Sequence, residues 1–396
     1  MGVIYGSAGV GKSTTIKHVS RFLNYKEKLY LTQTNPAKEN LMARIDAAHA
    51  TFSTIASFLR SETAVTDYEL MVIDECTTVS NKDMVAVLNK AHFNMLLLVG
   101  DTYQIDAIQF GNWFTVLKYF LPPYAIFELT EPYRTKDTDL LELWKRVRNM
   151  SDNVKECIQV NTYALNVDPS LLSSVGEDEA ILCLNYDGLY GINNINRFLQ
   201  ESNPNPAVTW DVQQYKVGDP VLFLESEKYH PVIHNNLKGV IRGIEIIDPG
   251  TYRENIQFDV EVQKLIDEEE AMWHGIRLLD SNYETGTSLV RFSVYKAMST
   301  DEDTDRVSSQ AIVPFQIAYA VSIHKAQGLE FNSVKIVITD EVEELVTHDI
   351  FYTAITRARE NLKIYWTPET EEKVLKRIKP KDVSSDVEIL KKYLNE

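Results

Sequence analysis

Short apolar runs alternate with helical patterns over the first 150 residues of the chain. The runs are too short for helices and end in polar turns, which is typical of buried parallel strands. We expect strands at 3–5, 28–32, 70–73 and 95–99, and helices at 14–23 and 36–48. This alternation predicts an open α/β sheet that binds ligands at the carboxyl ends of its strands.

A second α/β pattern begins near residue 180, is interrupted, and resumes after residue 312. Expected strands at 181–184, 334–338 and 362–365 accompany expected helices at 190–199 and 349–359. The interruption is rich in β and turn signals, with strands expected at 220–224, 239–247, 256–262 and 288–295 and a short helix at 264–272. We therefore predict an α/β domain at 1–150, a second one formed by 151–212 and 312–396, and a β-rich insert at 213–311.

The charge is distributed unevenly between these segments. The chain has 396 residues and a net charge of −17, yet residues 1–150 hold 16 basic and 16 acidic side chains. The whole excess lies beyond residue 150 and is densest at 259–284 and 301–305, where a solvated surface is the ordinary interpretation. The acidity alone therefore does not exclude a nucleic-acid partner for the first domain.

The cellular location is suggested only by signals that are absent from the sequence. No apolar run approaches the roughly 18 residues of a membrane span, and no signal peptide is visible. The three cysteines, Cys76, Cys157 and Cys183, match neither a disulfide framework nor a zinc spacing. We expect a cytoplasmic protein in a reducing environment, with no membrane partner.

Residues 6–13 carry the strongest chemical signal, because they fit the pattern G-x-x-x-x-G-K-[ST] between a strand and a helix. Glycines allow backbone amides to turn towards phosphate oxygens, and the helix N-terminus adds positive potential. Lys12 can reach the β- and γ-phosphates, and the Ser13 hydroxyl can hold Mg²⁺. The predicted nucleotide-binding residues are Gly6, Gly9, Gly11, Lys12, Ser13 and Thr14.

Further candidates lie after the next apolar runs. Asp74 can join the Mg²⁺ shell, and Glu75 can activate the attacking water. Gln104, in Gly-Asp-Thr-Tyr-Gln, is placed to sense the γ-phosphate or to position the attacking water. Arg134 and Arg357 are far from the P-loop in sequence, which suits a site between two α/β domains where arginines neutralise developing charge.

Taken in order, these motifs resemble the superfamily 1 helicases. Two late motifs strengthen the resemblance, namely Ser-Ile-His-Lys-Ala-Gln-Gly-Leu-Glu-Phe at 322–331 and Thr-Arg-Ala at 356–358. The form His-Lys-x-Gln-Gly is similar to the RecD and Dda branch, superfamily 1B. Residues 218–221 and 235–240 resemble the region that opens the inserted barrel of RecD-like proteins, so the match spans nearly the whole chain.

The resemblance implies two RecA-like domains, a β-rich SH3-like barrel inserted in the second, and ATP with Mg²⁺ bound between the two. It also implies 5′ to 3′ movement along single-stranded DNA, with RNA left open as the strand. Arg134 and Arg357 would be arginine fingers, and Gly328 and Glu330 would contact the nucleotide. Lys325 and Gln327 would couple the ATP state to the strand. The implied strand contacts are Thr34, Asn35, Thr54, Ser322, His324 and Lys325.

Some assignments remain open in the sequence. His324 can alternatively be a core histidine, and the aromatic residues Tyr103, Trp113, Phe114 and Trp210 can either stack on bases or fill cores. The glutamine element that reads adenine in the family is absent from this sequence. Only nineteen residues separate Thr54 from Asp74, which leaves little room for a strand-separating hairpin.

The acidic insert suggests a docking face for a protein partner. The alternative function is therefore a P-loop ATPase that acts as a regulatory switch or assembly factor on a protein. A nucleotide kinase is a third option, which leaves the late arginine motifs unexplained.

Overall fold

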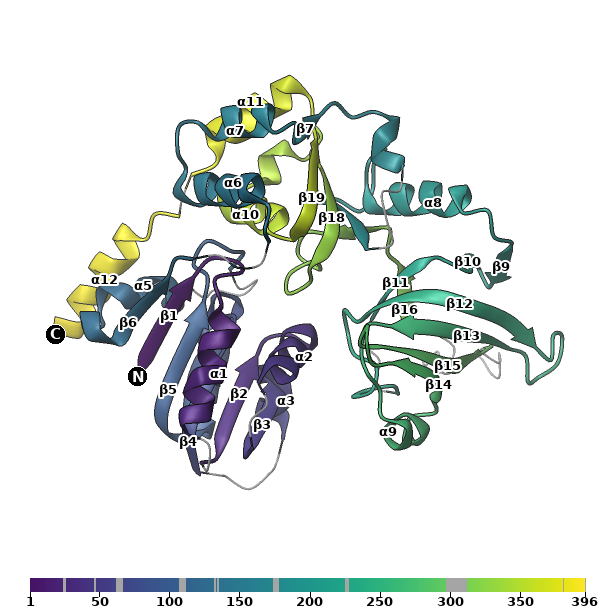
Figure 1. Ribbon diagram of the computed structural model, residues 1–396, viewed down its shortest axis with the longest axis horizontal. Coiled ribbons are helices and arrows are strands. Elements are labelled where there is room, and N and C mark those ends of the chain that lie inside the picture. Colours follow the sequence, from purple (N-terminus) through teal and green to yellow (C-terminus); the bar gives the residue numbers. More distant parts are fainter. Residues whose placement is uncertain are drawn as a thin grey trace. The chain divides into compact units, whose positions relative to one another are not determined.

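The computed structural model describes most of the chain in two compact units (Figure 1). The first unit comprises Met1–Leu184 and Ser322–Glu396, and the second comprises Asn185–Val321. The described residues are 1–23, 26–45, 48–61, 67–106, 112–131, 133, 135–173, 178–224, 228–296, 312–379 and 381–395. Among them, no helix is both long enough and apolar enough to cross a membrane.

A six-stranded parallel sheet forms the core of the N-terminal half of the first unit, in the order β3-β2-β4-β5-β1-β6. Alternate residues of β4 serve opposite faces: Met71 and Ile73 pack with one apolar cluster, and Leu70 and Val72 pack with the other. Helices cover both faces of the sheet, which explains why the strand sequences are nearly continuous apolar runs. The strands are β1 (Gly2–Gly6), β2 (Lys28–Thr32), β3 (Ala50–Thr54), β4 (Asp67–Ile73), β5 (His92–Gly100) and β6 (Ile126–Leu129).

The helices of this half follow the strands in alternation. They are α1 (Lys12–Phe22), α2 (Asn35–Arg44), α3 (Ile55–Arg60), α4 (Asn81–Lys90) and α5 (Trp113–Val116), with 3-10 turns η1 (Cys76–Thr78), η2 (Leu117–Tyr119) and η3 (Pro123–Ala125). The predicted helix at 36–48 ends earlier, at Arg44, because Ile45 is extended and packs into the core.

A five-stranded sheet forms the rest of the first unit, in the order β17-β8-β18-β19-β7. Strands β7, β19, β18 and β8 pair in parallel. The strands are β7 (Ala164–Leu165), β8 (Glu179–Cys183), β17 (Ala320–Ser322), β18 (Phe331–Val337) and β19 (Ala358–Tyr365). Its helical segments are α6 (Thr138–Asn149), α7 (Val154–Val160), η4 (Pro169–Leu172), η5 (Glu343–Leu345), α10 (His348–Ile355), α11 (Pro368–Arg377) and α12 (Ser384–Asn395).

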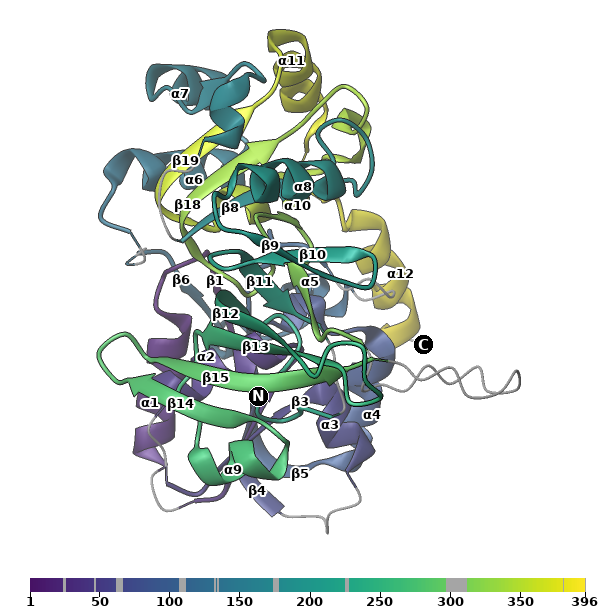
Figure 2. The same ribbon diagram turned by 90° about the vertical axis from the view of Figure 1, so that its right-hand side faces the viewer.

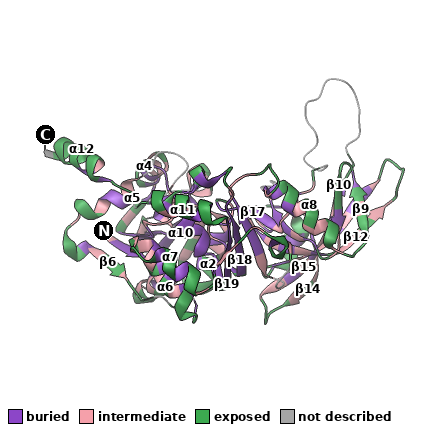
Figure 3. Cartoon of the chain, turned by 90° about the horizontal axis from the view of Figure 1, so that it is seen from above, coloured by how far each residue is buried: buried purple, intermediate pink, exposed green. Residues whose placement is uncertain are grey.

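The predicted α/β class, with two parallel sheets that fit two RecA-like domains, is confirmed. The predicted helix at 349–359 was too long: α10 ends at Ile355, and Ala358 already pairs with Phe331 of β18. In Figure 3 the buried residues concentrate in strands such as β17 and β18, whereas α12 is largely exposed.

The second unit is β-rich and antiparallel. Six strands follow the order β14-β15-β13-β12-β11-β16, and a separate hairpin joins β9 to β10 (Figure 2). Packed aromatic rings, including Phe223, Phe258, Phe292 and Phe315, fill its core. The predicted SH3-like barrel is not confirmed by this arrangement.

The elements of the second unit, in chain order, are α8 (Ile192–Ser202), β9 (Ala207–Trp210), β10 (Gln213–Lys216), β11 (Pro220–Phe223), β12 (Lys238–Ile247), β13 (Asn255–Val262), α9 (Glu268–Trp273), β14 (Arg277–Asn282), β15 (Thr287–Tyr295) and β16 (Phe315–Ile317).

Candidate nucleotide and strand site

The loop between β1 and α1 has the backbone that a phosphate cradle needs. Gly9 and Gly11 have positive φ values of 75° and 85°, which L side chains rarely adopt. A Cβ on Gly6 would lie 2.6 Å from Cγ2 of Val10, so the loop closes only around a glycine. The N-terminus of α1, capped by Gly11, therefore opens into a tight turn of backbone amides.

Lys12 lies inside this turn. Its Nζ donates to the carbonyl oxygens of Gly6 and Ser7, both at 2.9 Å. Ser13 beside it is half-buried, and Thr14 is exposed. Hydrogen bonds to these two carbonyl oxygens thus hold the ammonium group over the loop. A bound phosphate can replace the carbonyls as acceptor and form stronger hydrogen bonds between opposite charges.

Asp74 and Glu75 follow β4 at the same end of the sheet. Burial raises the pKa of the Asp74 carboxyl, while the positive charges of Lys12 and Arg44 act to lower it. The backbone N–H of Glu75 donates to Oδ1 of Asp74 at 2.9 Å. Because β1, β5 and β4 run parallel in one sheet, the P-loop after β1 and Asp74 after β4 lie at the same carboxyl edge.

Glu75 has an unusual backbone for its residue type. Its φ is 55°, in the left-handed region that costs a non-glycine residue about 1–2 kcal/mol. Such local strain clusters at functional sites, where the surrounding structure holds a side chain in a required direction.

The loop at 322–330 reaches both Glu75 and Thr34. A Cβ on Gly328, whose φ is 79°, would lie 3.6 Å from Oγ1 of Thr34 and 3.8 Å from Oε1 of Glu75. The positive φ favours glycine at this position, and the late motif lies beside a catalytic candidate and a strand-binding candidate at once.

The Gln104 motif is joined to the late motifs through its backbone. The Ile105 N–H donates to Oγ1 of Thr353 at 3.1 Å, and Nε2 of Gln327 donates to the Ile105 carbonyl at 3.3 Å. Gln104 itself is half-buried, with its Nε2 3.4 Å from Oδ2 of Asp101. The two halves of the first unit thus meet at Ile105, which sequence reasoning did not identify.

Arg357 is buried and bound within its own half of the unit. Its Nε donates to the Thr353 carbonyl at 3.0 Å, and its Nη1 donates to the Leu329 carbonyl at 3.1 Å. Glu330 accepts from Nε and Nη2 of Arg359 through one carboxylate oxygen, at 3.0 and 2.9 Å. Both side chains thus hold the 322–330 loop in place here, and their contacts with a nucleotide remain predictions.

The motif that contains Arg134 is anchored on the P-loop. Arg134 itself lies outside the described residues, but the backbone N–H of Tyr133 donates to the Gly9 carbonyl at 2.7 Å. The Tyr133 side chain is exposed and lies 4.0 Å from where a Cβ on Gly11 would be.

The early strand-binding candidates are helix caps at one edge of the sheet. Oγ1 of Thr34 accepts from the Ala37 N–H and caps α2, and Oγ1 of Thr54 accepts from the Ser57 N–H and caps α3. Thr54 ends β3 opposite the end of β2, so both caps lie at the same carboxyl edge. Asn35, the first residue of α2, is half-buried.

The late strand-binding candidates share one turn. Oγ of buried Ser322 accepts from the Lys325 N–H at 3.1 Å, and Lys325 is half-buried. His324 is exposed, so the alternative of a core histidine is wrong.

The aromatic candidates are mostly structural. Phe114 and Trp210 are buried, at 1% and 4% exposure, and the Trp113 indole donates to the Val79 carbonyl. Base stacking by Phe114 and Trp210 is therefore excluded in this conformation.

A buried polar cluster next to the Gln104 motif was not predicted. The Arg148 guanidinium lies 4.7 Å from the Tyr103 ring centre, and that ring meets Tyr352 edge-on. Burial raises the pKa of Tyr352, the Asp101 carboxylate raises it further, and Arg148 acts to lower it. No spacing in the sequence indicates this cluster, since its members come from separate elements.

Comparisons with known families agree with this geometry. An AAA domain model matches residues 1–161, and a UvrD-like helicase C-terminal domain model matches residues 317–365. The chain is similar to the RecBCD enzyme subunit RecD of Buchnera aphidicola subsp. Schizaphis graminum, with 23% identity over 198 residues, which is 49% of this chain and 25% of that protein. RecD of Mycolicibacterium smegmatis is 28% identical over 91 residues, or 23% of this chain and 16% of that protein.

Solved structures extend the likeness to the whole chain. Bacteroides Pif1 bound to ssDNA matches with a TM-score of 0.58 and 16% identity, covering 100% of this chain and 94% of that one. Candida albicans Pif1 matches with a TM-score of 0.56 and 15% identity, covering 100% and 95%. The fold is thus that of the Pif1 structures, and the predicted resemblance to RecD-like superfamily 1B helicases is confirmed. The chain spans a quarter or less of the length of the curated relatives described above.

Proposed function

We propose that the chain is an ATP-dependent translocase or helicase that moves 5′ to 3′ on single-stranded DNA. The observation that carries the proposal is the position of Gly328, next to both Glu75 and Thr34. A single loop thereby lies beside the residue that would activate water and a residue that would hold the strand. Hydrolysis at one contact can then alter grip at the other.

The nucleotide roles combine the P-loop geometry with the roles that the helicase resemblance implies. Lys12 and the Gly6, Gly9 and Gly11 turn hold phosphates, with Ser13 and Thr14 at the start of α1. Gln104 senses the γ-phosphate, and Arg134 and Arg357 neutralise its charge. Gly328 and Glu330 complete the nucleotide contacts. Arg357 would have to exchange its bond to the Leu329 carbonyl for phosphate oxygens to act as a finger.

Mg²⁺ fits the residues that the P-loop and β4 bring together. The Ser13 hydroxyl and the Asp74 carboxylate are hard oxygen donors of the kind that this ion prefers. Burial raises the pKa of Asp74 and so disfavours its ionised form. A nearby cation would stabilise that ionised form, which is the one that binds a metal ion. The ion would neutralise phosphate charge, while Glu75 holds and deprotonates the attacking water.

The strand roles rest on helix caps and on the turn at 322–325, in which His324 is exposed. Thr34, Asn35 and Thr54 lie at one carboxyl edge, where backbone amides and the N-terminus of α2 suit phosphates. Ser322, His324 and Lys325 form the second contact. Pif1 structures solved with ssDNA support DNA as the strand, and RNA is the alternative that the experiment below separates.

The domain assignment is part of the proposal: RecA-like domains at 1–150 and at 151–212 with 312–396, and an SH3-like barrel at 213–311. The antiparallel strands of the second unit support a β-rich insert. Residues 55–61 and 67–73, described between Thr54 and Asp74, form α3 and β4 and hold no hairpin wedge. We therefore expect translocation to be more efficient than duplex separation.

A regulatory ATPase acting on a protein partner is the second candidate. Residues 185–321 hold 21 acidic and 11 basic side chains, which favours a basic protein over a phosphate backbone at that unit. Under this alternative, ATP hydrolysis would not depend on any polynucleotide.

Strand displacement on tailed duplexes tests the main proposal. Duplexes with a 5′ or a 3′ tail, each made in DNA and in RNA, are incubated with the protein, ATP and Mg²⁺. We expect product only from the 5′-tailed DNA. Displacement from the 3′ tail would overturn the direction, and displacement of RNA alone would overturn the substrate.

A further inference from the structure

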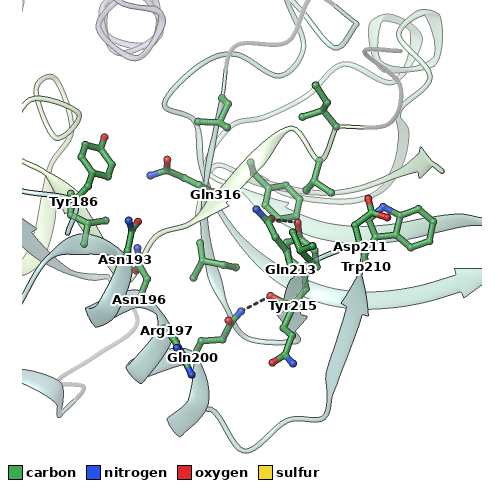
Figure 4. A pocket seen from close by; sticks show the side chains of 18 residues that line it. Tyr186, Asn193, Asn196, Arg197, Gln200, Trp210, Asp211, Gln213, Tyr215 and Gln316 are labelled. Carbon is green, nitrogen blue, oxygen red and sulfur yellow. Dashed lines mark hydrogen bonds between the residues drawn. The ribbon is translucent and has the colours of Figure 1, made fainter. Parts of the chain in front are cut away.

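The second unit contains a cavity of about 520 Å³ whose lining is almost uncharged. Figure 4 shows its walls, which come from α8, the β9–β10 hairpin and the strand around Gln316. Of the eighteen lining residues, only Arg197 and Asp211 carry charge. Amide side chains predominate among the polar ones: Asn193, Asn196, Gln200, Gln213, Gln214 and Gln316.

An unpaired sheet edge runs along this cavity. In the described part of the chain, β16 pairs with β11 alone and is the last strand of its sheet. The Leu224 N–H donates to Pro314 and the Ala318 N–H donates to Pro220, so residues 314, 316 and 318 direct their backbone groups at β11. By strand alternation, the N–H and C=O groups of Phe315 and Ile317 point away from β11.

The other edge at the cavity is already covered. The Gln214 carbonyl of β10 accepts from Nε2 of Gln200 at 2.9 Å, and the Lys216 N–H donates to Asp219 at 2.9 Å. An added strand can therefore pair with β16 and not with β10.

The cavity wall also holds an unsatisfied donor. Nε1 of Trp210 is buried without a hydrogen-bond partner among the described residues, in a side chain that is 4% exposed. A buried donor without a partner costs about 1–3 kcal/mol. At the rim, Val212 is 96% exposed and Ile312 is 58% exposed, which leaves apolar surface for side chains of a ligand.

We propose that this cavity binds an extended, basic segment of a protein partner, which adds to β16 as a further strand. Main-chain bonds to Phe315 and Ile317 would supply affinity, and alternate side chains would contact Val212 and Ile312. The lining itself is almost uncharged, so the preference for a basic segment comes from the surrounding unit, whose residues 185–321 carry a net charge of −10. A nucleic-acid strand is disfavoured, because one arginine in the lining cannot neutralise a run of phosphates.

A peptide library tests the proposal directly. The probes are acetylated heptapeptides that have Lys at every second position and a varied residue at each position in between. They are added to the full chain at concentrations up to the millimolar range. We expect the best binders to protect the amide hydrogens of Phe315 and Ile317 from exchange, while the Gln316 amide is protected with and without peptide.

Two matched controls separate strand addition from simple charge attraction. A copy of the best peptide with N-methylated amides along the pairing edge keeps its charge and should bind at least about tenfold more weakly, which is the loss of roughly one hydrogen bond. Val212→Lys should weaken binding by a similar factor. Tyr283→Lys, at a position of the same unit that is 82% exposed and lies outside the cavity, should not.

Four results would overturn the proposal. They are no bound peptide in the library, equal binding of the N-methylated peptide, equal effects of the two lysine variants, and protection of Phe315 and Ile317 by oligo-dT instead of by peptide. None of these measurements uses ATP, so failure here leaves the proposed translocase activity standing.

Discussion

At the scale of single residues, variants of Lys12 and Glu75 should distinguish nucleotide binding from hydrolysis. Glu75→Gln removes the proposed base and keeps the shape of the side chain, so we expect ATP affinity to change little while kcat falls by about 10²–10⁴-fold. Lys12→Ala removes the ammonium group from the loop and should abolish hydrolysis. Fluorescent-nucleotide titration and steady-state ATPase measure the two properties.

Lys17→Ala is the matched control, because Lys17 lies on the same helix as Lys12 but outside the P-loop motif. It removes the same charge and should leave kcat within about twofold, as surface changes usually do. Full ATPase activity in Glu75→Gln would contradict its assignment as the base.

The three cysteines provide a test that needs no mutation. All are buried, and burial raises the pKa of Cys76 and Cys157 and raises that of Cys183 to about 12. Since only the thiolate reacts, we expect no reaction of the folded protein with Ellman's reagent at pH 8. All three should react after unfolding, and rapid titration of any thiol in the folded state would contradict the buried environments.

The sequence predicted contiguous motifs well and side-chain partners poorly. Residues 6–13 form the expected turn because their pattern is local. By contrast, the carbonyl partners of Arg357 and the pairing of Glu330 with Arg359 depend on which segments pack together. The cluster of Tyr103, Arg148 and Tyr352 was missed for the same reason.

At the scale of elements, helix α10 holds the Gln104 loop through Thr353. Thr353→Val keeps the volume and leaves the buried Ile105 N–H without its acceptor, which should lower the free energy of unfolding by about 1–3 kcal/mol. Thr353→Ser keeps the hydroxyl and should restore most of that loss. Urea denaturation measures both, and equal stability of the Val and Ser variants would contradict the bond.

Helix α12 packs onto the N-terminal half of the first unit. Val383 and Val387 contact Val116 and Phe120, and Lys381 forms an ion pair with Asp106 nearby. Val387→Asp places a charge in this contact and should lower the free energy of unfolding by about 2 kcal/mol. The control Ile389→Asp, at a half-exposed position of the same helix, should change it by less than about 0.5 kcal/mol. Equal losses would show that α12 does not dock through Val387.

Helices and strands were predicted correctly where burial alone determines the pattern of apolar residues. The strand expected at 28–32 has the same bounds as β2, because both of its faces are covered. Prediction failed where pairing overrides local propensity, since Ala358 continues a helical pattern yet joins β19 beside Phe331. Short edge strands such as β16 and β17 carry too few residues to show a period.

At the scale of the whole molecule, the boundary in net charge does not coincide with the boundary between the two compact units. The charge changes at residue 150, whereas the first unit joins residues 1–184 to 322–396. The net charge of −17 belongs to residues beyond 150, and residues 185–321 carry a net charge of −10 of it. The first 150 residues, which hold the P-loop and the caps Thr34 and Thr54, are neutral. Local neutralisation of phosphates is therefore compatible with an acidic chain.

Stimulation of ATP hydrolysis by a single strand tests the proposed coupling between the ATP site and the strand-binding residues. The steady-state ATPase rate is measured with Mg²⁺ and increasing oligo-dT, with Lys12→Ala as the blank. Because the Gly328 loop lies beside both Glu75 and Thr34, we expect a rate that rises at least about tenfold and saturates with the strand. A rate that is independent of DNA and RNA, and absent in Lys12→Ala, would contradict this coupling and favour the protein-directed ATPase.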